Sequence, residues 1–279
     1  MSTAGRGGSA GAGQAGRSGA GAGQGAGSAA AAGGGASLQK FSFFVSSYAA
    51  MQRLSGSRDG FGGDLRFGQA DGLSGADEIC RQIAETSMPG SGSKGWHAFL
   101  SVTKGLDGKP VHAIDRVGNG PWYDRAGRLV AQNKADLAQT RPNGADTAII
   151  NDLPNEDGVP NHAPDGEQVD NHDILTGSSA TGTLFSTDWS HTCHDWTSSE
   201  GADGAPRVGH AWPRMGGGHS GGGSPPAGGG SMDNWMSALD EAGCAPGASL
   251  IEMGPPDPEV PTVGSGGGYG GIYCFAWMP

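Results

Sequence analysis

Gly271-Ile-Tyr-Cys-Phe-Ala-Trp277, near the end of the 279-residue chain, is the stretch from which the fold is best predicted. Its aromatic and β-branched residues favour a strand, and Ile272, Cys274 and Ala276 share one face because side chains alternate along a strand. A strand this short cannot fold alone. It must therefore pair with strands formed before the Gly-rich segment 213–231, which we interpret as a flexible surface loop of the same domain.

A helix is predicted over residues 74–85, where apolar side chains recur at helical spacing. Ser74, followed three residues later by Asp77, resembles a capping box and indicates where the helix starts. The apolar face is expected to point into the core and consists of Ala76, Ile79, Cys80 and Ile83.

Short strands separated by long loops make up the rest of the prediction. Aromatic and β-branched residues favour a first strand at 41–47, and a turn at 124–127 separates two short strands within 119–130. Further strands are expected at 96–102, 191–197 and 207–210. One or two helices combined with many short, twisted antiparallel strands predict an α+β fold.

The composition limits how much of the chain can pack into a core. With 55 glycines and 17 prolines, much of the sequence disfavours regular helix or strand. Residues 1–36 are almost entirely Gly, Ala, Ser and Gln, so ordering them would lose backbone entropy with nothing to bury in return. We therefore predict a disordered stalk over 1–36 and one domain over 37–279.

The net charge of −11 argues against a nucleic-acid partner, because affinity for phosphates comes from clustered Lys and Arg. No apolar run approaches the roughly 20 residues that a membrane-spanning helix needs, so no transmembrane segment is predicted. The first residues also lack the apolar stretch of a signal peptide, so none is predicted there.

Four widely spaced cysteines, Cys80, Cys193, Cys244 and Cys274, indicate two disulfides formed in an oxidising compartment. None of them has the close Cys-x-x-Cys spacing of a zinc site. Three pairings are possible, and spacing alone does not choose among them. Side-chain direction would allow Cys80 on the helix to meet Cys274 on the terminal strand, which leaves Cys193 and Cys244 for each other.

A series of motifs between Phe41 and Trp277 occurs in an order that resembles one protein family. It includes Phe43-Phe-Val-Ser-Ser, Gly72-Leu-Ser-Gly-Ala-Asp-Glu-Ile-Cys80, Trp96-His-Ala-Phe-Leu-Ser, Asp173-Ile-Leu-Thr-Gly-Ser, Asp195-Trp-Thr-Ser and Tyr273-Cys-Phe-Ala. The family comprises the endostatin-like, or leptospiral-type, domains of bacterial surface lipoproteins and secreted proteins.

This resemblance implies a C-type-lectin-like fold with nested bridges, helix to last strand and middle strand to the preceding loop. For this chain these are the bonds Cys80–Cys274 and Cys193–Cys244. It also implies a location outside the cytoplasm, extracellular or on the outer cell surface. Since some leptospiral relatives are adhesins, an extracellular protein or polysaccharide is the expected kind of partner.

Two segments carry residue types that bind metals. His191 and His194 lie three residues apart, so in a strand they would point to opposite faces and would not share an ion without a bulge. Residues 155–173 are rich in oxygen ligands, which suits Ca²⁺, but they lack EF-hand spacing and a solvated acidic loop is favoured. The sugar-binding triplets of calcium-dependent lectins are also absent. No cofactor or metal ligand is therefore predicted.

No catalytic residue is predicted either. Gly90-Ser-Gly-Ser and Gly264-Ser-Gly lie in Gly-Ser runs, where a match to a hydrolase motif is compositional. The seven tryptophans are a possible sugar-stacking platform, but most of them are expected in the core.

A non-enzymatic binding module, secreted or displayed at the cell surface, is the hypothesis that unites these features. It would recognise an extracellular protein or glycan through its long loops. Two alternatives stay open. One is an enzyme on a lectin-like fold, either metal-dependent or related to the formylglycine-generating oxidases, which need a reactive cysteine pair that bridged cysteines do not supply. The other is a structural envelope protein.

Overall fold

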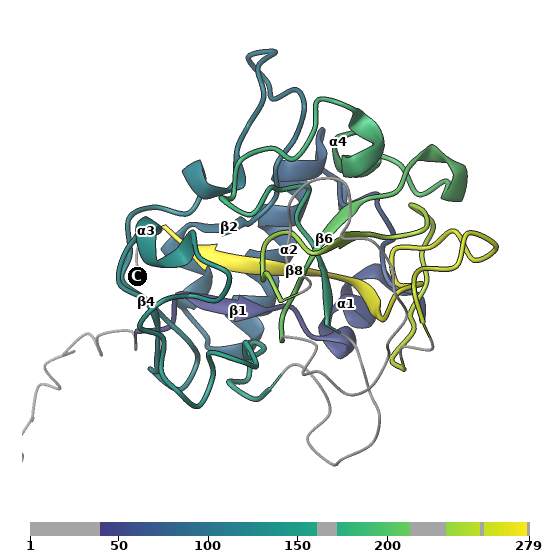
Figure 1. Ribbon diagram of the computed structural model, residues 1–279. Helices are drawn as coiled ribbons and strands as arrows, with labels where there is room; N and C mark the ends of the chain where they lie inside the picture. Colours follow the sequence, from purple (N-terminus) through teal and green to yellow (C-terminus); the bar gives the residue numbers. More distant parts are fainter. Residues whose placement is uncertain (1–39, 161–171, 213–232, 252–253, 278–279) are drawn as a thin grey trace, which may run out of the picture. The chain divides into compact units, whose positions relative to one another are not determined.

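The computed structural model describes residues 40–160, 172–212, 233–251 and 254–277 (Figure 1). The chain divides into two units, residues 1–37 and 38–279, and all described residues belong to the second. The predicted stalk over 1–36 and the predicted loop over 213–231 lie outside the described residues.

Within these residues the main sheet has six strands in the order β1, β8, β5, β6, β7, with β2 also paired to β8 (Figure 1). β8 is central: β1 and β2 are antiparallel to its second half, and β5 is parallel to its first half. The strands are β1 (Phe43–Val45), β2 (Trp96–Ala98), β5 (Asp173–Leu175), β6 (Arg207–His210), β7 (Leu239–Asp240) and β8 (Gly268–Ala276); β3 (Trp122–Tyr123) pairs with β4 (Leu129–Ala131) in a separate sheet.

The α+β class is therefore confirmed, with differences in detail. The parallel pairing of β5 with β8 departs from the all-antiparallel expectation, and β5 itself is absent from the predicted strands. β8 begins three residues before the predicted terminal strand. The turn expected at 124–127 joins β3 to β4, where the Gly127 amide donates to the Asp124 carbonyl oxygen at 3.0 Å.

Both faces of β8 are buried. Ile272 and Cys274 belong to a core cluster that packs against α2, whereas Tyr273 and Phe275 belong to a second cluster with Trp235. Consecutive residues enter different clusters because side chains alternate between the faces of a strand. A strand covered on both sides needs an apolar residue or glycine at nearly every position, and this explains the composition of 268–276.

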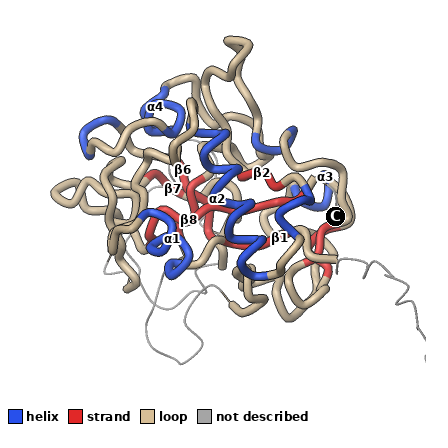
Figure 2. The backbone as a smooth tube through the Cα atoms, turned by 180° about the vertical axis from the view of Figure 1, so that it is seen from behind, coloured by secondary structure: helices blue, strands red, loops and turns tan. Residues whose placement is uncertain are grey.

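The longest described helix, α2 (Gly72–Ser87), lies against the sheet (Figure 2). It starts before the predicted position because Asp71 is the N-cap: its Oδ1 accepts a hydrogen bond from the Ser74 amide at 2.8 Å. A second helix, α1 (Tyr48–Ser55), is absent from the predicted elements. The helices α3 (Lys134–Leu137) and α4 (Cys193–Trp196) are single turns. No helix among the described residues is long and apolar enough to cross a bilayer.

The strand predicted at 191–197 is wrong. A 3-10 turn occupies Trp189–Thr192, and α4 follows with every φ angle in the left-handed region. The local composition of aromatic and β-branched residues favours a strand. Tertiary contacts override this preference, because the side chains of Cys193 and Trp196 are both buried in the core at this point.

Two disulfides join distant parts of the domain. Cys80 of α2 is bonded to Cys274 of β8, with Cα atoms 5.6 Å apart, and Cys193 is bonded to Cys244, with Cα atoms 5.7 Å apart. This is the pairing that the family resemblance implies. The first bond connects the main helix to the central strand, and the second connects the left-handed turn to the segment before β8.

Candidate functional site

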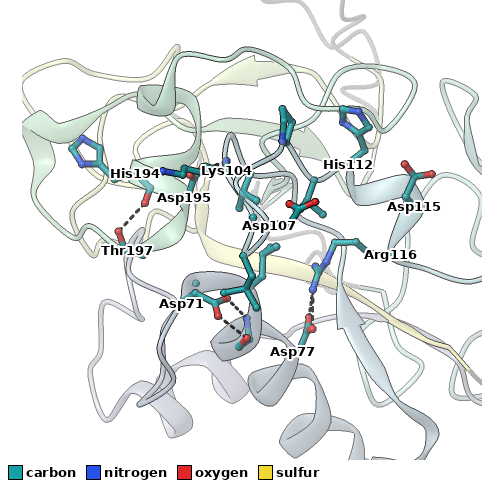
Figure 3. Close-up of a pocket in the computed structure, with 18 residues that line it drawn as sticks. Asp71, Asp77, Lys104, Asp107, His112, Asp115, Arg116, His194, Asp195 and Thr197 are labelled. Carbon is teal, nitrogen blue, oxygen red and sulfur yellow. Dashed lines mark hydrogen bonds and ion pairs between the residues drawn. The ribbon is translucent and has the colours of Figure 1, made fainter.

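A surface pocket of about 780 Å³ lies where three segments of the domain meet (Figure 3). The first wall is the start of α2, with residues 71–74 and 77. The second wall consists of residues within 102–116, and the third consists of residues 194, 195 and 197. These segments are far apart in sequence. The pocket therefore exists only when the whole domain is folded.

The third wall is built by an unusual backbone. Cys193, His194, Asp195 and Trp196 have φ angles of 46°, 56°, 58° and 63°, and none of the four is a glycine. The left-handed conformation costs such residues about 1–2 kcal/mol each, so other interactions must hold this left-handed turn in place. The Cys193–Cys244 bond provides one of them, and Trp196 provides another through its buried ring, whose Nε1 donates to the Ser101 carbonyl oxygen at 2.9 Å.

Asp195 connects the left-handed turn to the second wall. Its Oδ1 accepts a hydrogen bond from the Thr103 amide at 2.6 Å, and its Oδ2 accepts from Thr103 Oγ1 at 2.9 Å and from the Lys104 amide at 3.2 Å. The carboxylate thus satisfies two backbone N–H groups at the base of the loop that carries Lys104 and Leu106. Because this loop is anchored at its base, its exposed tip projects from a fixed position.

Asp77 and Arg116 form the floor between the first two walls (Figure 3). Arg116 Nη2 donates to both carboxylate oxygens of Asp77, at 2.7 and 2.8 Å, and His97 Nδ1 lies 2.9 Å from Asp77 Oδ2. Burial raises the pKa of Asp77, but the hydrogen bond with His97 and the positive charge of Arg116 outweigh that effect and leave the pKa below its ordinary value. Asp77 is therefore a structural carboxylate that holds the pocket floor.

We expect Asp77→Asn to destabilise the domain by about 2 kcal/mol at neutral pH, because Arg116 keeps its charge in a mostly buried position without its anion. A carboxyl whose folded pKa is depressed contributes stability above its unfolded pKa of about 4, and this contribution is lost as the pH falls through the folded pKa. The difference between wild type and variant should therefore shrink below pH ~4. Urea unfolding at pH 7 and pH 3 measures both values.

Glu78→Gln is the matched control for this prediction. Glu78 is the next residue of α2 and pairs with Arg81 on the surface, where such ion pairs contribute less than about 1 kcal/mol. Equal losses for the two variants would contradict the role assigned to Asp77.

Aromatic and imidazole rings lie at the edge of the pocket. His194 stacks on Trp189 with ring centroids 3.7 Å apart, and 56% of the Trp189 surface remains exposed. His112 Nδ1 accepts a hydrogen bond from the Leu184 amide at 2.9 Å, so the neutral ring carries its proton on Nε2. Together with the exposed Lys104 and Asp115, these groups can donate and accept hydrogen bonds and present a flat ring to a ligand.

The two histidines considered as a metal pair have different neighbours. His191 Nδ1 lies 3.4 Å from Asp240 Oδ1, and its pKa is raised by that carboxylate in spite of partial burial. His194 instead stacks on Trp189 and lies at the edge of the pocket. The structure thus gives the two side chains separate roles.

The oxygen-rich segment 155–173 is only partly described, because residues 161–171 lie outside the described residues. In its first part Asn155 Oδ1 accepts from the Asp157 amide, and Glu156 accepts from the amide and hydroxyl of Ser47. At its end, Asp173 is buried in the sheet beside His172 and His210. The side chains of Asn155 and Glu156 therefore make contacts within the fold.

The remaining candidate residues of the sequence have structural positions. Ser91 Oγ donates to the Ala84 carbonyl oxygen, and Ser265 Oγ donates to Glu241 Oε2. Most of the seven tryptophans lie in the core, as expected: Trp96, Trp122, Trp196 and Trp235 are buried, Trp212 is partly buried, and Trp189 and Trp277 are about half exposed.

The pocket itself is not visible in the sequence. Asp77 and Asp195 belong to two of the motifs that carry the family resemblance. The sequence also places Asp77 in a capping box, but in the structure the N-cap is Asp71 and Asp77 pairs with Arg116. Comparison with models of known protein families and with curated proteins finds no match to this chain.

Proposed function

We propose that residues 37–279 form an extracellular, non-enzymatic binding module with a C-type-lectin-like fold, which takes part of a glycan or of an extracellular protein into this pocket. The observation that carries the proposal is the left-handed turn. A backbone strained at consecutive non-glycine residues, held by a disulfide and a buried tryptophan, is more often found at a functional site than in a neutral loop.

Groups in the pocket and beside it support the same class of ligand. The half-exposed Trp189, stacked on His194, offers a planar surface of the kind on which sugar rings and aromatic side chains pack. Leu106 is 93% exposed at the tip of the second wall, so its apolar side chain is available for contact with a ligand in the pocket. The charged residues Lys104, Asp107 and Asp115 line the same pocket.

The two disulfides support the proposed extracellular location. All four cysteines are bridged, and structural disulfides persist in oxidising surroundings such as the periplasm or the cell exterior. The bridged cysteines also leave no thiol for oxidase chemistry, which favours the binding module over that alternative.

The test is binding of the purified chain, with its disulfides intact, to an array of bacterial and host polysaccharides and to a panel of extracellular matrix proteins. For a ligand found in this way, we expect Leu106→Asp and Trp189→Ala each to weaken binding at least about tenfold, because hot-spot contacts of this kind contribute more than about 1.4 kcal/mol. Titration by surface plasmon resonance gives the affinity of each variant.

Val260→Asp is the control, since Val260 is an exposed apolar residue that does not line the pocket. It should bind like the wild type. Absence of any saturable ligand, or equal binding by the wild type and by the Leu106 and Trp189 variants, would contradict the proposal; the first result would favour a structural envelope protein.

A further inference from the structure

A second group of polar side chains lies inside the domain, away from the pocket-lining residues. Asp173 is the first residue of β5 and pairs directly with His210 of β6. Residues opposite each other in an antiparallel pair point to the same face with Cβ atoms about 5 Å apart. His172 precedes Asp173, and its carbonyl oxygen accepts from the Ala211 amide at 2.8 Å. The sheet register therefore brings two imidazoles and one carboxylate together.

The geometry of this cluster is that of a metal site. His210 Nε2 lies 3.0 Å and His172 Nε2 lies 3.3 Å from the same oxygen, Asp173 Oδ1. One ligand atom from each residue lies within 4.8 Å of the other two, and all three side chains are at most 1% exposed. A tetrahedral zinc ion with bonds of about 2.0–2.1 Å separates neighbouring ligand atoms by about 3.3–3.4 Å, which fits this spacing.

A second buried carboxyl group, that of Glu241, lies near Asp173. Glu241 is 1% exposed, and its Oε2 accepts hydrogen bonds from the Gly266 amide at 2.8 Å and from Ser265 Oγ at 3.1 Å. A Cβ at Gly266 would lie 2.8 Å from Asp173 Oδ2 and 3.4 Å from Glu241 Oε2, so only glycine leaves room for the two carboxyl groups there. The two buried carboxyl groups therefore both lie against Gly266.

We propose that His172, Asp173 and His210 bind one divalent transition-metal ion, and that Zn²⁺ is the natural occupant. Two imidazole nitrogens with one carboxylate suit zinc and exclude a typical calcium or magnesium site, which is built from oxygen ligands. In the sheet, β5 has β8 as one neighbour and β6 as the other. Since the site is buried between β5 and β6, the ion has a structural role and joins these two strands. Glu241, beside Asp173, orients that ligand.

The experiment uses the full chain without a polyhistidine tag and with both disulfides formed. The protein is stripped with a chelator, dialysed against Zn²⁺ and analysed by inductively coupled plasma mass spectrometry. We expect one zinc per chain and a higher thermal unfolding temperature than for the stripped protein, since an ion that binds only the folded state stabilises it. His172→Gln and His210→Gln should each weaken zinc binding at least about tenfold. Even the mutation of a residue that only hydrogen-bonds to a metal ligand lowers metal affinity about 10–100-fold.

His97→Gln is the matched control, because His97 is a partly exposed histidine outside the cluster, and it should retain one zinc. X-ray absorption spectroscopy of the zinc-loaded wild type does not depend on whether the variants fold, and it should show two imidazole ligands with oxygen and without sulfur. No zinc above background in the wild type, zinc retained by both cluster variants, or a spectrum without two imidazoles would each overturn the proposal.

Discussion

The double substitution of Cys80 and Cys274 by serine is expected to lower the free energy of unfolding by about 5 kcal/mol. The bond spans a sequence separation of 194 residues, so its loss releases a very large loop in the unfolded chain. Domains of this kind are stable by only about 5–15 kcal/mol, so the loss removes between about a third and all of the stability. Urea unfolding followed by tryptophan fluorescence measures the difference.

The corresponding double serine variant of Cys193 and Cys244 provides the comparison. This bond spans 51 residues, for which the same chain-entropy argument predicts a loss of about 4 kcal/mol. The longer loop should therefore give the larger loss. A Cys80–Cys274 variant as stable as the wild type would show that packing between α2 and β8 holds the domain together without the bond.

Trp196→Ala is expected to cost about 4 kcal/mol, the largest effect expected here of a single substitution on stability. The indole is fully buried, and its removal creates a cavity in the core cluster beside α2. It also removes the donor to the Ser101 carbonyl oxygen, which lies in the buried segment that leads into the pocket's second wall. Near-UV circular dichroism during urea unfolding follows this variant without relying on the deleted fluorophore.

Trp189→Ala tests whether burial of the indole ring causes the loss of stability expected for Trp196→Ala. Trp189 lies seven residues earlier and is 56% exposed, so its removal should change stability by no more than about 0.5 kcal/mol. A large loss in Trp189→Ala, or a small one in Trp196→Ala, would contradict the view that Trp196 holds the left-handed turn.

The elements that could be predicted from sequence are those in which local pattern and tertiary position agree. Phe43–Val45 and the end of β8 combine strand-favouring residues with burial, and the apolar spacing from Ala76 to Ile83 is satisfied by a helix packed on the sheet. The predicted start of α2 is too late because Asp71 and Ser74 are both good capping residues. Only the structure shows that the Asp71 side chain accepts the backbone hydrogen bond.

The features that could not be predicted from the sequence depend on contacts between residues far apart in the chain. Nothing local in Cys193–Trp196 indicates left-handed backbone, because the disulfide to Cys244 and the burial of Trp196 impose it. The pairing of Asp173 with His210 is likewise invisible before the register of β5 and β6 is known, so Asp173 was grouped with an oxygen-rich loop. The pocket walls come from three segments, and no spacing rule connects them.

The position of β8 has a consequence for how the protein is made. It is the last described strand to leave the ribosome, yet β1, β2 and β5 all pair with it. The Ile272 amide donates to Ser46 Oγ across 226 residues, and contacts at such separations form slowly because a long loop must close first. The domain therefore folds after synthesis has passed residue 276 rather than segment by segment. A growing chain therefore lacks the strand with which β1, β2 and β5 all pair until its last described residues have been made.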